Sequence, residues 1–252
     1  MPDPDYDDLH AALVAPVAVE RLPLYYWRPG TRLLAVGSRD GVSFAGDPVA
    51  AERNTFRRPL SAAMLTELQG KLGCAGFAAV WSDALQHPRG LALLAEVAGA
   101  GPLVVCTPGR APIDPALFAQ VAAWVLLVDA EPGPAVAEIL AHGRHVEVLI
   151  GLDDRPLPDL PWAQAAAVHL VARRPAEAER LDEWCAAVRA TWTAPVALHD
   201  PHHQHSDCVC GERLIWRHNG RFRYDAFDPL RGACTHCGAV QRGVWSQPRP
   251  GG

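Results

Sequence analysis

The feature of the sequence that most constrains the fold is a regular alternation of short apolar runs with amphipathic stretches. Arg32–Ser38 (RLLAVGS) has the pattern of a buried strand. Ser61–Gly73 has a Ser cap, apolar residues at helical spacing and a terminal Gly, which predicts a helix. Further strands are predicted at Gly76–Ser82, Pro102–Thr107, Trp124–Ala130, His145–Leu152, Ala165–Ala172 and Ala194–Asp200, and further helices at Arg89–Gly101, Asp114–Ala122, Pro134–Gly143 and Ala176–Ala190. Roughly six to seven β-α units predict a parallel sheet wrapped by helices. A partial or complete β/α barrel and an open doubly wound sheet both fit this alternation of strands and helices.

Charge and length exclude several classes of partner. The chain has 252 residues and a net charge of −5, without a sustained basic run, which argues against nucleic acid and anionic membranes. The acidic start MPDPDYDDLH lacks the layout of a signal peptide, and no apolar run reaches the roughly 18 residues of a membrane span. We therefore expect a cytoplasmic protein. In that reducing compartment, closely spaced cysteines indicate a metal more than disulfides.

The loops that follow the predicted strands contain acidic residues but no complete catalytic set. In parallel α/β folds the chemistry lies at the carboxyl ends of the strands. These loops lack a cysteine cluster, a glycine-rich phosphate loop and a nucleophile elbow, and their acidic residues are Asp40, Asp47, Asp83, Asp129 and Glu131. Solvated loop carboxylates are the simpler interpretation.

Several segments together resemble one enzyme family. They are VERLPLYYWRPGTRLLAVGS (Val19–Ser38), GFAAVWSDALQHP (Gly76–Pro88), VVCTPG (Val104–Gly109), VLLVDAE (Val125–Glu131), LIGLDD (Leu149–Asp154) and the tail CVCGERLIWRHNGRF…LRGACTHCGAVQRGVW. The chain thus resembles the AmmeMemoRadiSam-system radical SAM enzymes, relatives of the pyruvate formate-lyase activating enzymes, from roughly Pro16 to Trp245. The barrel segments match in a scattered way, whereas the tail is the most specific match.

The resemblance implies a radical-SAM-like partial (β/α) barrel of parallel strands followed by a small C-terminal zinc-ribbon-like module. The implied organisation is an N-terminal leader at 1–18, the barrel at 19–200, the cysteine-rich module at 201–246 and a tail at 247–252. The family's additional cysteine-rich N-terminal segment is missing, because only a short acidic leader precedes PLYYW.

The resemblance also implies that the radical chemistry has been lost. The family's Cys-x3-Cys-x2-Cys motif corresponds to Gly41, Ala45 and Pro48, none of which can supply a thiolate to a [4Fe–4S] cluster. No such cluster is therefore expected. Asp83 replaces the Glu that lines the SAM amino-group site in the family. Asp83 and Asp129 would then face a vestigial cofactor cavity.

Two cysteine pairs near the C-terminus form the strongest local motif. Cys208-x-Cys210 and Cys234-x2-Cys237 are each followed by a Gly, the layout of zinc-ribbon knuckles. The stretch between them predicts two strands joined by an Asn-Gly turn. We expect a structural Zn²⁺, or adventitious Fe²⁺, on the four thiols. The alternative is a module that has lost its metal and is held by packing.

The other His and Cys residues are considered as substitute metal ligands or as buried side chains. The family's first pair is Cys-x2-Cys, so a nearby histidine could replace a ligand, and the candidates are His202, His203 and His205. The isolated thiols are read as buried apolar residues, namely Cys74, Cys106 and Cys185.

Two functions of different class follow. The first is a non-catalytic subunit or scaffold for a protein partner, with Leu22–Trp27 (LPLYYW) as an exposed apolar contact patch. The second is a repurposed enzyme that binds a small molecule in the old cavity, with lining residues Asp83, Asp129, Glu131 and Arg110. An intact radical SAM enzyme with other cluster ligands fits less well, since the remaining paired thiols belong to the C-terminal module.

Overall fold

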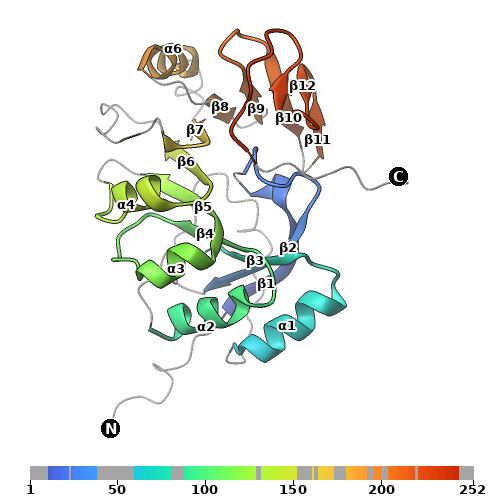
Figure 1. Cartoon of the computed structure of the whole chain (residues 1–252), viewed down its shortest axis with the longest axis vertical. Helices are drawn as coiled ribbons and strands as arrows, with labels where there is room; N and C mark the ends of the chain where they lie inside the picture. Colours follow the sequence, from blue (N-terminus) through green and yellow to red (C-terminus); the bar gives the residue numbers. More distant parts are fainter. Residues whose placement is uncertain are drawn as a thin grey trace.

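The computed structural model describes residues 11–22, 24–38, 60–80, 88–128, 132–151, 161, 164–172, 180–191, 196–199, 204–218 and 221–243. Its centre is an eleven-stranded sheet in which every strand lies beside its neighbours in sequence (Figure 1). The strands are β1 (Ala11–Ala18), β2 (Arg32–Ser38), β3 (Gly76–Ala79), β4 (Leu103–Thr107), β5 (Val121–Val128), β6 (Val146–Gly151), β7 (Ala167–Val171), β8 (Val196–His199), β9 (Gln204–Asp207), β10 (Arg213–His218) and β11 (Arg221–Tyr224). A second, two-stranded sheet pairs β12 (Phe227–Asp228) with β13 (Ala233–Cys234).

The middle of the large sheet is parallel and its two edges are antiparallel. Strands β2 to β8 pair in parallel, whereas β1 and β9 to β11 run antiparallel to their neighbours. The helices are η1 (Val19–Arg21), α1 (Ala62–Lys71), α2 (Pro88–Ala98), α3 (Pro115–Gln120), α4 (Val136–His142) and α6 (Leu181–Thr191). The predicted alternation of strands and helices is confirmed, and the protein is a mixed α/β fold with a mostly parallel central sheet.

Helix starts follow the capping residues in the sequence. The Ser61 hydroxyl accepts the Met64 N–H at 3.2 Å, and the Asp114 carboxylate accepts the Ala116 N–H at 2.8 Å. Strand β5 begins three residues before its predicted start at Trp124, directly after α3, because buried Val121 already pairs with Leu103 of β4.

The described α-helices all pack on one face of the sheet. One core cluster joins side chains of α1, α2, α3, α4 and α6 to alternate strand residues such as Leu34 and Val36. The intervening residues, such as Leu33 and Ala35, point to the other face and belong to a separate cluster. A doubly wound sheet needs helices on both faces, so the described elements do not fit that alternative.

The face opposite the helices is covered by an N-terminal segment that we call the strap (Leu22 and Leu24–Trp27). The prediction of an exposed patch at Leu22–Trp27 is wrong, because the described side chains of this segment are at most 2% exposed. Leu22, Leu24 and Trp27 pack against apolar side chains of β2 to β5. The aromatic residues are therefore needed inside the protein, where they cover a sheet face on which none of the described α-helices packs.

The sheet extends beyond the limits expected for the barrel. Residues 11–18, expected to form a leader, make strand β1 at one edge, and β9 to β11 of the C-terminal module continue the same sheet beyond β8 (Figure 1). The expected tail at 247–252 lies outside the described residues. None of the helices in the described ranges combines the length and apolarity needed to cross a bilayer.

Candidate metal centre

The first knuckle follows β9 and the second includes the end of β13. In the first, the Cys208 carbonyl accepts the Gly211 N–H at 2.9 Å, and the Cys208 N–H donates to the Glu212 backbone carbonyl at 2.8 Å. In the second, the Gly238 N–H donates to the Cys234 carbonyl at 3.0 Å, and the Cys234 N–H donates to the Ala239 carbonyl at 2.9 Å. These turns bring the two cysteine pairs together.

The four thiols converge on one point. The Sγ atoms of Cys208 and Cys237 are 3.5 Å apart, those of Cys210 and Cys234 are 3.8 Å apart, and all four lie within 4.8 Å of one another. A tetrahedral zinc with Zn–S bonds of about 2.3 Å would place its sulfurs about 3.8 Å apart. The described thiols therefore have the spacing that a tetrahedral metal requires, and four cysteine ligands would leave no open position on it.

The environments of the thiols differ. Cys208 and Cys234 are buried, whereas Cys210 and Cys237 are exposed. Burial raises the pKa of Cys208 to about 12, and the Ala239 backbone N–H lowers the pKa of Cys237 to about 7. A divalent cation would displace the protons of all four thiols, so binding would be weakened by acid.

One side chain outside the ligand set contacts the sulfurs. Buried Gln241 directs its amide nitrogen to the Cys208 sulfur at 3.9 Å and donates to the Ala239 carbonyl at 3.0 Å. Such a contact would orient a ligand and offset part of the negative charge of the thiolates.

Of the histidines considered as substitute ligands, the one in the described part of the chain does not join the thiols. His205 lies on β9, with its Nε2 3.7 Å from the Asp207 carboxylate, and is not in the convergent group. His202 and His203 lie outside the described residues. The Cys-x-Cys spacing thus lets both cysteines face the second pair without a histidine.

A glycine substitution tests the second knuckle. Gly238 has a φ of 76°, and an added Cβ would meet no atom within 4 Å, so the backbone conformation alone requires glycine. We expect Gly238→Ala to weaken zinc affinity by about 1–2 kcal/mol, or roughly 5- to 30-fold, in a competition with a chelator.

The matched control is Gly70→Ala in α1, where an added Cβ also meets no atom within 4 Å. It should stabilise the helix by up to about 1 kcal/mol and leave zinc affinity unchanged. Equal zinc affinities of the Gly238→Ala variant and the native protein would contradict the assignment of the knuckle.

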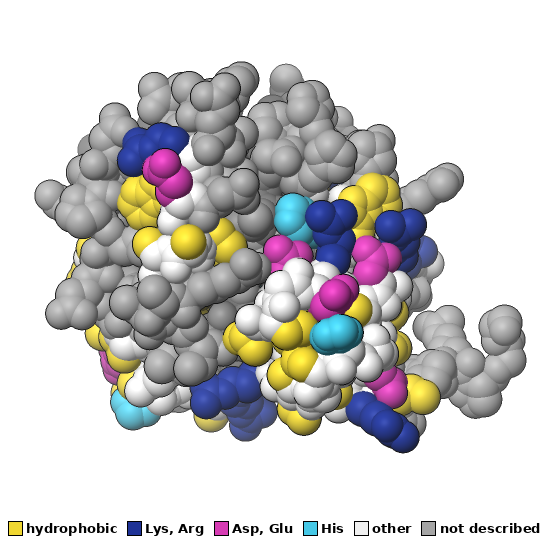
Figure 2. Space-filling view, turned by 90° about the horizontal axis from the view of Figure 1, so that it is seen from above, with side chains coloured by type: hydrophobic (Ala, Val, Ile, Leu, Met, Phe, Trp, Pro, Cys, Tyr) yellow, Lys and Arg dark blue, Asp and Glu magenta, His cyan; other side chains and the backbone are white. Residues whose placement is uncertain are grey.

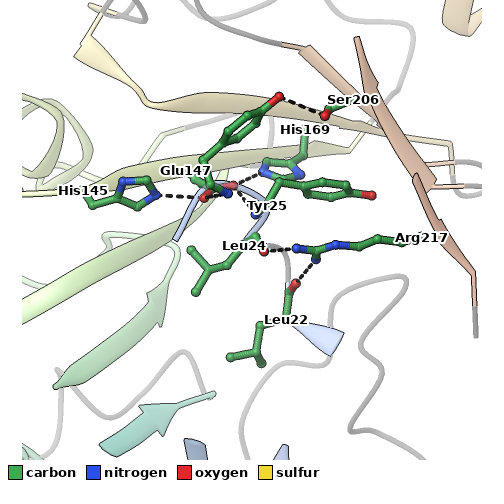
Figure 3. A network of polar contacts seen from close by, with 9 residues as sticks. Leu22, Leu24, Tyr25, His145, Glu147, His169, Ser206 and Arg217 are labelled. Carbon is green, nitrogen blue, oxygen red and sulfur yellow. Dashed lines mark hydrogen bonds and ion pairs between the residues drawn. The ribbon is translucent and has the colours of Figure 1, made fainter. Parts of the chain in front are cut away.

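A second polar cluster, which the sequence analysis missed, lies under the strap (Figure 3). At its centre is Glu147 of β6, whose side chain is fully buried. Its carboxylate accepts the backbone N–H groups of Tyr25 and Tyr26 at 2.7 and 2.8 Å. It also contacts Nε2 of His145 at 2.8 Å and Nε2 of His169 at 2.7 Å. Four donors around one carboxylate satisfy a charge that would otherwise be very costly to bury.

The protonation states in this cluster follow from burial and hydrogen bonding. Burial alone would raise the pKa of Glu147, but hydrogen bonds from His145 and His169 outweigh it and hold that pKa well below the usual glutamate range. Burial lowers the pKa of His169, so its ring is neutral near pH 7 and carries its proton on Nε2. The cluster thus contains an ionised carboxylate to which His169 donates as a neutral ring.

This arrangement predicts loss of stability in mild acid. The pKa of His169 is lower in the folded protein than its unfolded value of about 6.5, so below that pH the unfolded chain binds a proton that the folded protein does not. The free energy of unfolding should fall by up to about 1.4 kcal/mol per pH unit from this residue as pH drops from 6.5 toward the folded pKa. The stabilisation from Glu147, whose pKa is also lowered, should be lost only below about pH 4.5.

The measurement is urea unfolding of the native protein and of His169→Gln between pH 7 and pH 5. The Gln amide retains a donor toward Glu147 but does not titrate. The variant should therefore show a shallower dependence on pH than the native protein. Identical slopes would show that His169 does not titrate differently in the two states.

The remaining candidate residues divide into two groups. Arg110 is exposed, and the isolated thiols of Cys74, Cys106 and Cys185 are buried as expected. The acidic loop and cavity residues and the positions of the lost cluster cysteines lie outside the described residues, namely Asp40, Gly41, Ala45, Asp47, Pro48, Asp83, Asp129 and Glu131.

The two clusters therefore have different roles in the described structure. The four cysteines can hold a metal ion, whereas the Glu147 cluster is closed from solvent and binds backbone groups of the strap. Comparison with protein-family profiles, curated proteins and solved structures finds no match to this chain.

Proposed function

We propose that this protein is a non-catalytic, radical-SAM-like α/β protein that holds a structural Zn²⁺ and acts as a subunit or scaffold for a protein partner. The observation that carries the proposal is the convergence of four thiols within 4.8 Å on two glycine-terminated knuckles. Such a site can stabilise a small module but offers no coordination position to a substrate.

Zinc is the metal that best fits this ligand set. Tetrahedral sites of four sulfurs bind zinc or iron, and zinc has no redox chemistry that would need a substrate or an electron donor. Within the described residues, these cysteines are the one group of three or more His, Cys, Asp or Glu side chains whose ligand atoms all lie close enough together to hold a metal ion. A structural zinc would also explain how a module with few buried side chains keeps its fold.

The non-catalytic part of the proposal rests on the sequence. The positions that correspond to the cluster cysteines of radical SAM enzymes are Gly41, Ala45 and Pro48. The burial of the strap is in keeping with this proposal, because apolar side chains cover the face opposite the helices between β2 and β5.

The C-terminal module offers a surface for the proposed partner. Three of the large apolar side chains that are exposed in the described structure belong to it, with exposed fractions of 62% for Val209, 70% for Leu230 and 77% for Val240. Figure 2 shows acidic, basic and hydrophobic side chains mixed on this part of the surface. A mixed surface of this kind suits a protein better than a polyanion.

The test is the metal content of protein purified without oxygen, with zinc and iron measured together. We expect about one zinc per chain, bound by the four cysteines. After attempted iron–sulfide reconstitution, the protein should show no brown cluster and no cleavage of SAM. About four irons per chain together with SAM cleavage would overturn the non-catalytic proposal, and metal-free protein with a folded module would overturn the zinc proposal.

A further inference from the structure

The strap has an unusual way of satisfying its backbone. It forms no ladder with a neighbouring strand over Tyr25 and Tyr26, yet it is buried. Both N–H groups donate to the Glu147 carboxylate, at 2.7 and 2.8 Å. Arg217, in turn, binds carbonyl groups of the strap. The Glu147 carboxylate and the Arg217 guanidinium thus replace part of the backbone hydrogen bonding that a sheet would supply.

Arg217 reaches the strap from the C-terminal module. Its guanidinium donates to the Leu22 carbonyl at 3.0 Å and to the Leu24 carbonyl, and it lies 3.8 Å from the centre of the Tyr25 ring (Figure 3). The residue is 3% exposed. A buried guanidinium is costly unless its partners are held in place, so the position of β10 and the position of the strap depend on each other.

A second contact links the strap to the same module. The Tyr26 hydroxyl donates to the Ser206 hydroxyl at 2.9 Å, and both side chains are fully buried. Ser206 lies on β9 and pairs with Ile215 of β10. The hydrogen bonds described between the strap and the C-terminal module therefore involve side chains of β9 and β10.

These two strands are joined by the first cysteine knuckle. Strand β9 ends at Asp207, directly before Cys208, and β10 starts at Arg213, directly after Glu212. The Cys208 N–H donates to the Glu212 carbonyl, which closes the turn between the strands. A metal on the four cysteines would hold this turn, and through it the register that places Ser206 and Arg217 over the strap.

The Glu147 side of the strap is built differently. Glu147 lies on β6, in the parallel part of the sheet, where β5 and β7 flank it and α4 packs on the other face. None of the hydrogen bonds described for Glu147 comes from the cysteine knuckles. Loss of metal would remove the contacts from β9 and β10 but leave the carboxylate in place.

We propose that the strap is a metal-dependent latch, closed over the sheet while the four cysteines hold their metal and released when the metal is lost. This inference rests on the proposed metal site. Release would uncover the apolar face beneath the strap, including Leu33, Val104 and Val125. The metal centre would thereby control whether that face is accessible to another molecule.

The test is hydrogen exchange of the full-length protein with zinc, after zinc removal by a chelator, and after zinc is restored. Exchange at the Tyr25 and Tyr26 amides should accelerate by at least about tenfold without zinc and slow again when zinc returns. Amides of β4 and β5 serve as the internal reference and should change little. An equal acceleration in these strands would mean global unfolding and would overturn the latch.

The Arg217→Met variant tests the link without removing metal. It should retain zinc but show faster exchange at Tyr25 and Tyr26, whereas Arg223→Met, at an exposed arginine of β11, should leave both amides protected. If Arg217→Met does not fold, Tyr26→Phe removes just the bond to Ser206 and should accelerate exchange to a smaller extent.

The outcomes separate the latch from the proposed function. Protein that binds zinc but keeps its strap amides protected after zinc removal would overturn the latch and leave the zinc site intact. Protein that binds no zinc under any condition would overturn both. Unchanged protection in the zinc-bound Arg217→Met and Tyr26→Phe variants would show that the module does not hold the strap.

Discussion

Replacing Cys208 with Ser is expected to abolish binding of the proposed zinc and to unfold the C-terminal module while the parallel sheet stays folded. The Cys208 sulfur is buried and lies 3.5 Å from that of Cys237. A serine hydroxyl does not deprotonate near pH 7, so it cannot replace the thiolate. Zinc contributes about 10–16 kcal/mol to the folding of small zinc modules, which is more than packing supplies in a unit of this size.

The measurements are elemental analysis and limited proteolysis. Zinc should fall from about one per chain to a small fraction of that value, and cleavage should appear within residues 204–243. The matched control is Cys74→Ala, because Cys74 is a buried thiol outside the convergent group. That variant should keep its zinc. A Cys208→Ser protein with full zinc content and a protease-resistant module would contradict the assignment.

Replacing Glu147 with Gln is expected to lower the free energy of unfolding by about 2–4 kcal/mol. The carboxylate accepts hydrogen bonds from two backbone N–H groups and two imidazole rings. A Gln amide offers one oxygen, and its NH₂ group would face a donor. The variant therefore loses hydrogen bonds and leaves buried donors without an acceptor.

Urea unfolding followed by tryptophan fluorescence measures this loss. Glu138→Gln in α4 is the control, because Glu138 is exposed and the same atoms change. Its free energy of unfolding should stay within about 0.5 kcal/mol of the native value. If the Glu147→Gln variant were as stable as the control, the hydrogen bonds to the strap would contribute nothing measurable.

The secondary structure was largely predictable because its signals are local. The Ser61 and Asp114 caps, the glycine after α1 and the short apolar runs mark the elements to within a few residues. The cysteine knuckles were predictable for the same reason, since the ligands and the glycines of each turn lie within a few positions of each other. Among the differences are the start of β5, where α3 and β5 meet without a loop, and the edge strands β1 and β9, which were not predicted.

The Glu147 cluster also left a signal in the sequence, but an incomplete one. In His145–Leu149 (HVEVL), two polar residues alternate with valines, so His145 and Glu147 lie on the face away from the helices. A glutamate and a histidine in otherwise apolar strands indicate buried partners. The sequence does not say that these partners include the backbone of Tyr25 and Tyr26, more than a hundred residues away.

The sequence by itself determined the α/β alternation, the approximate limits of most helices and the two cysteine knuckles, because each depends on residues close together in the chain. The tertiary structure alone decided which face of the sheet carries the helices, what covers the other face, and that Glu147 from the middle of the chain and Arg217 from its C-terminal part both hold the strap. An apolar aromatic segment such as the strap favours burial against another protein as much as against its own sheet. Only the position of that sheet face, which long-range strand pairing sets, decides between burial against another protein and burial within the chain.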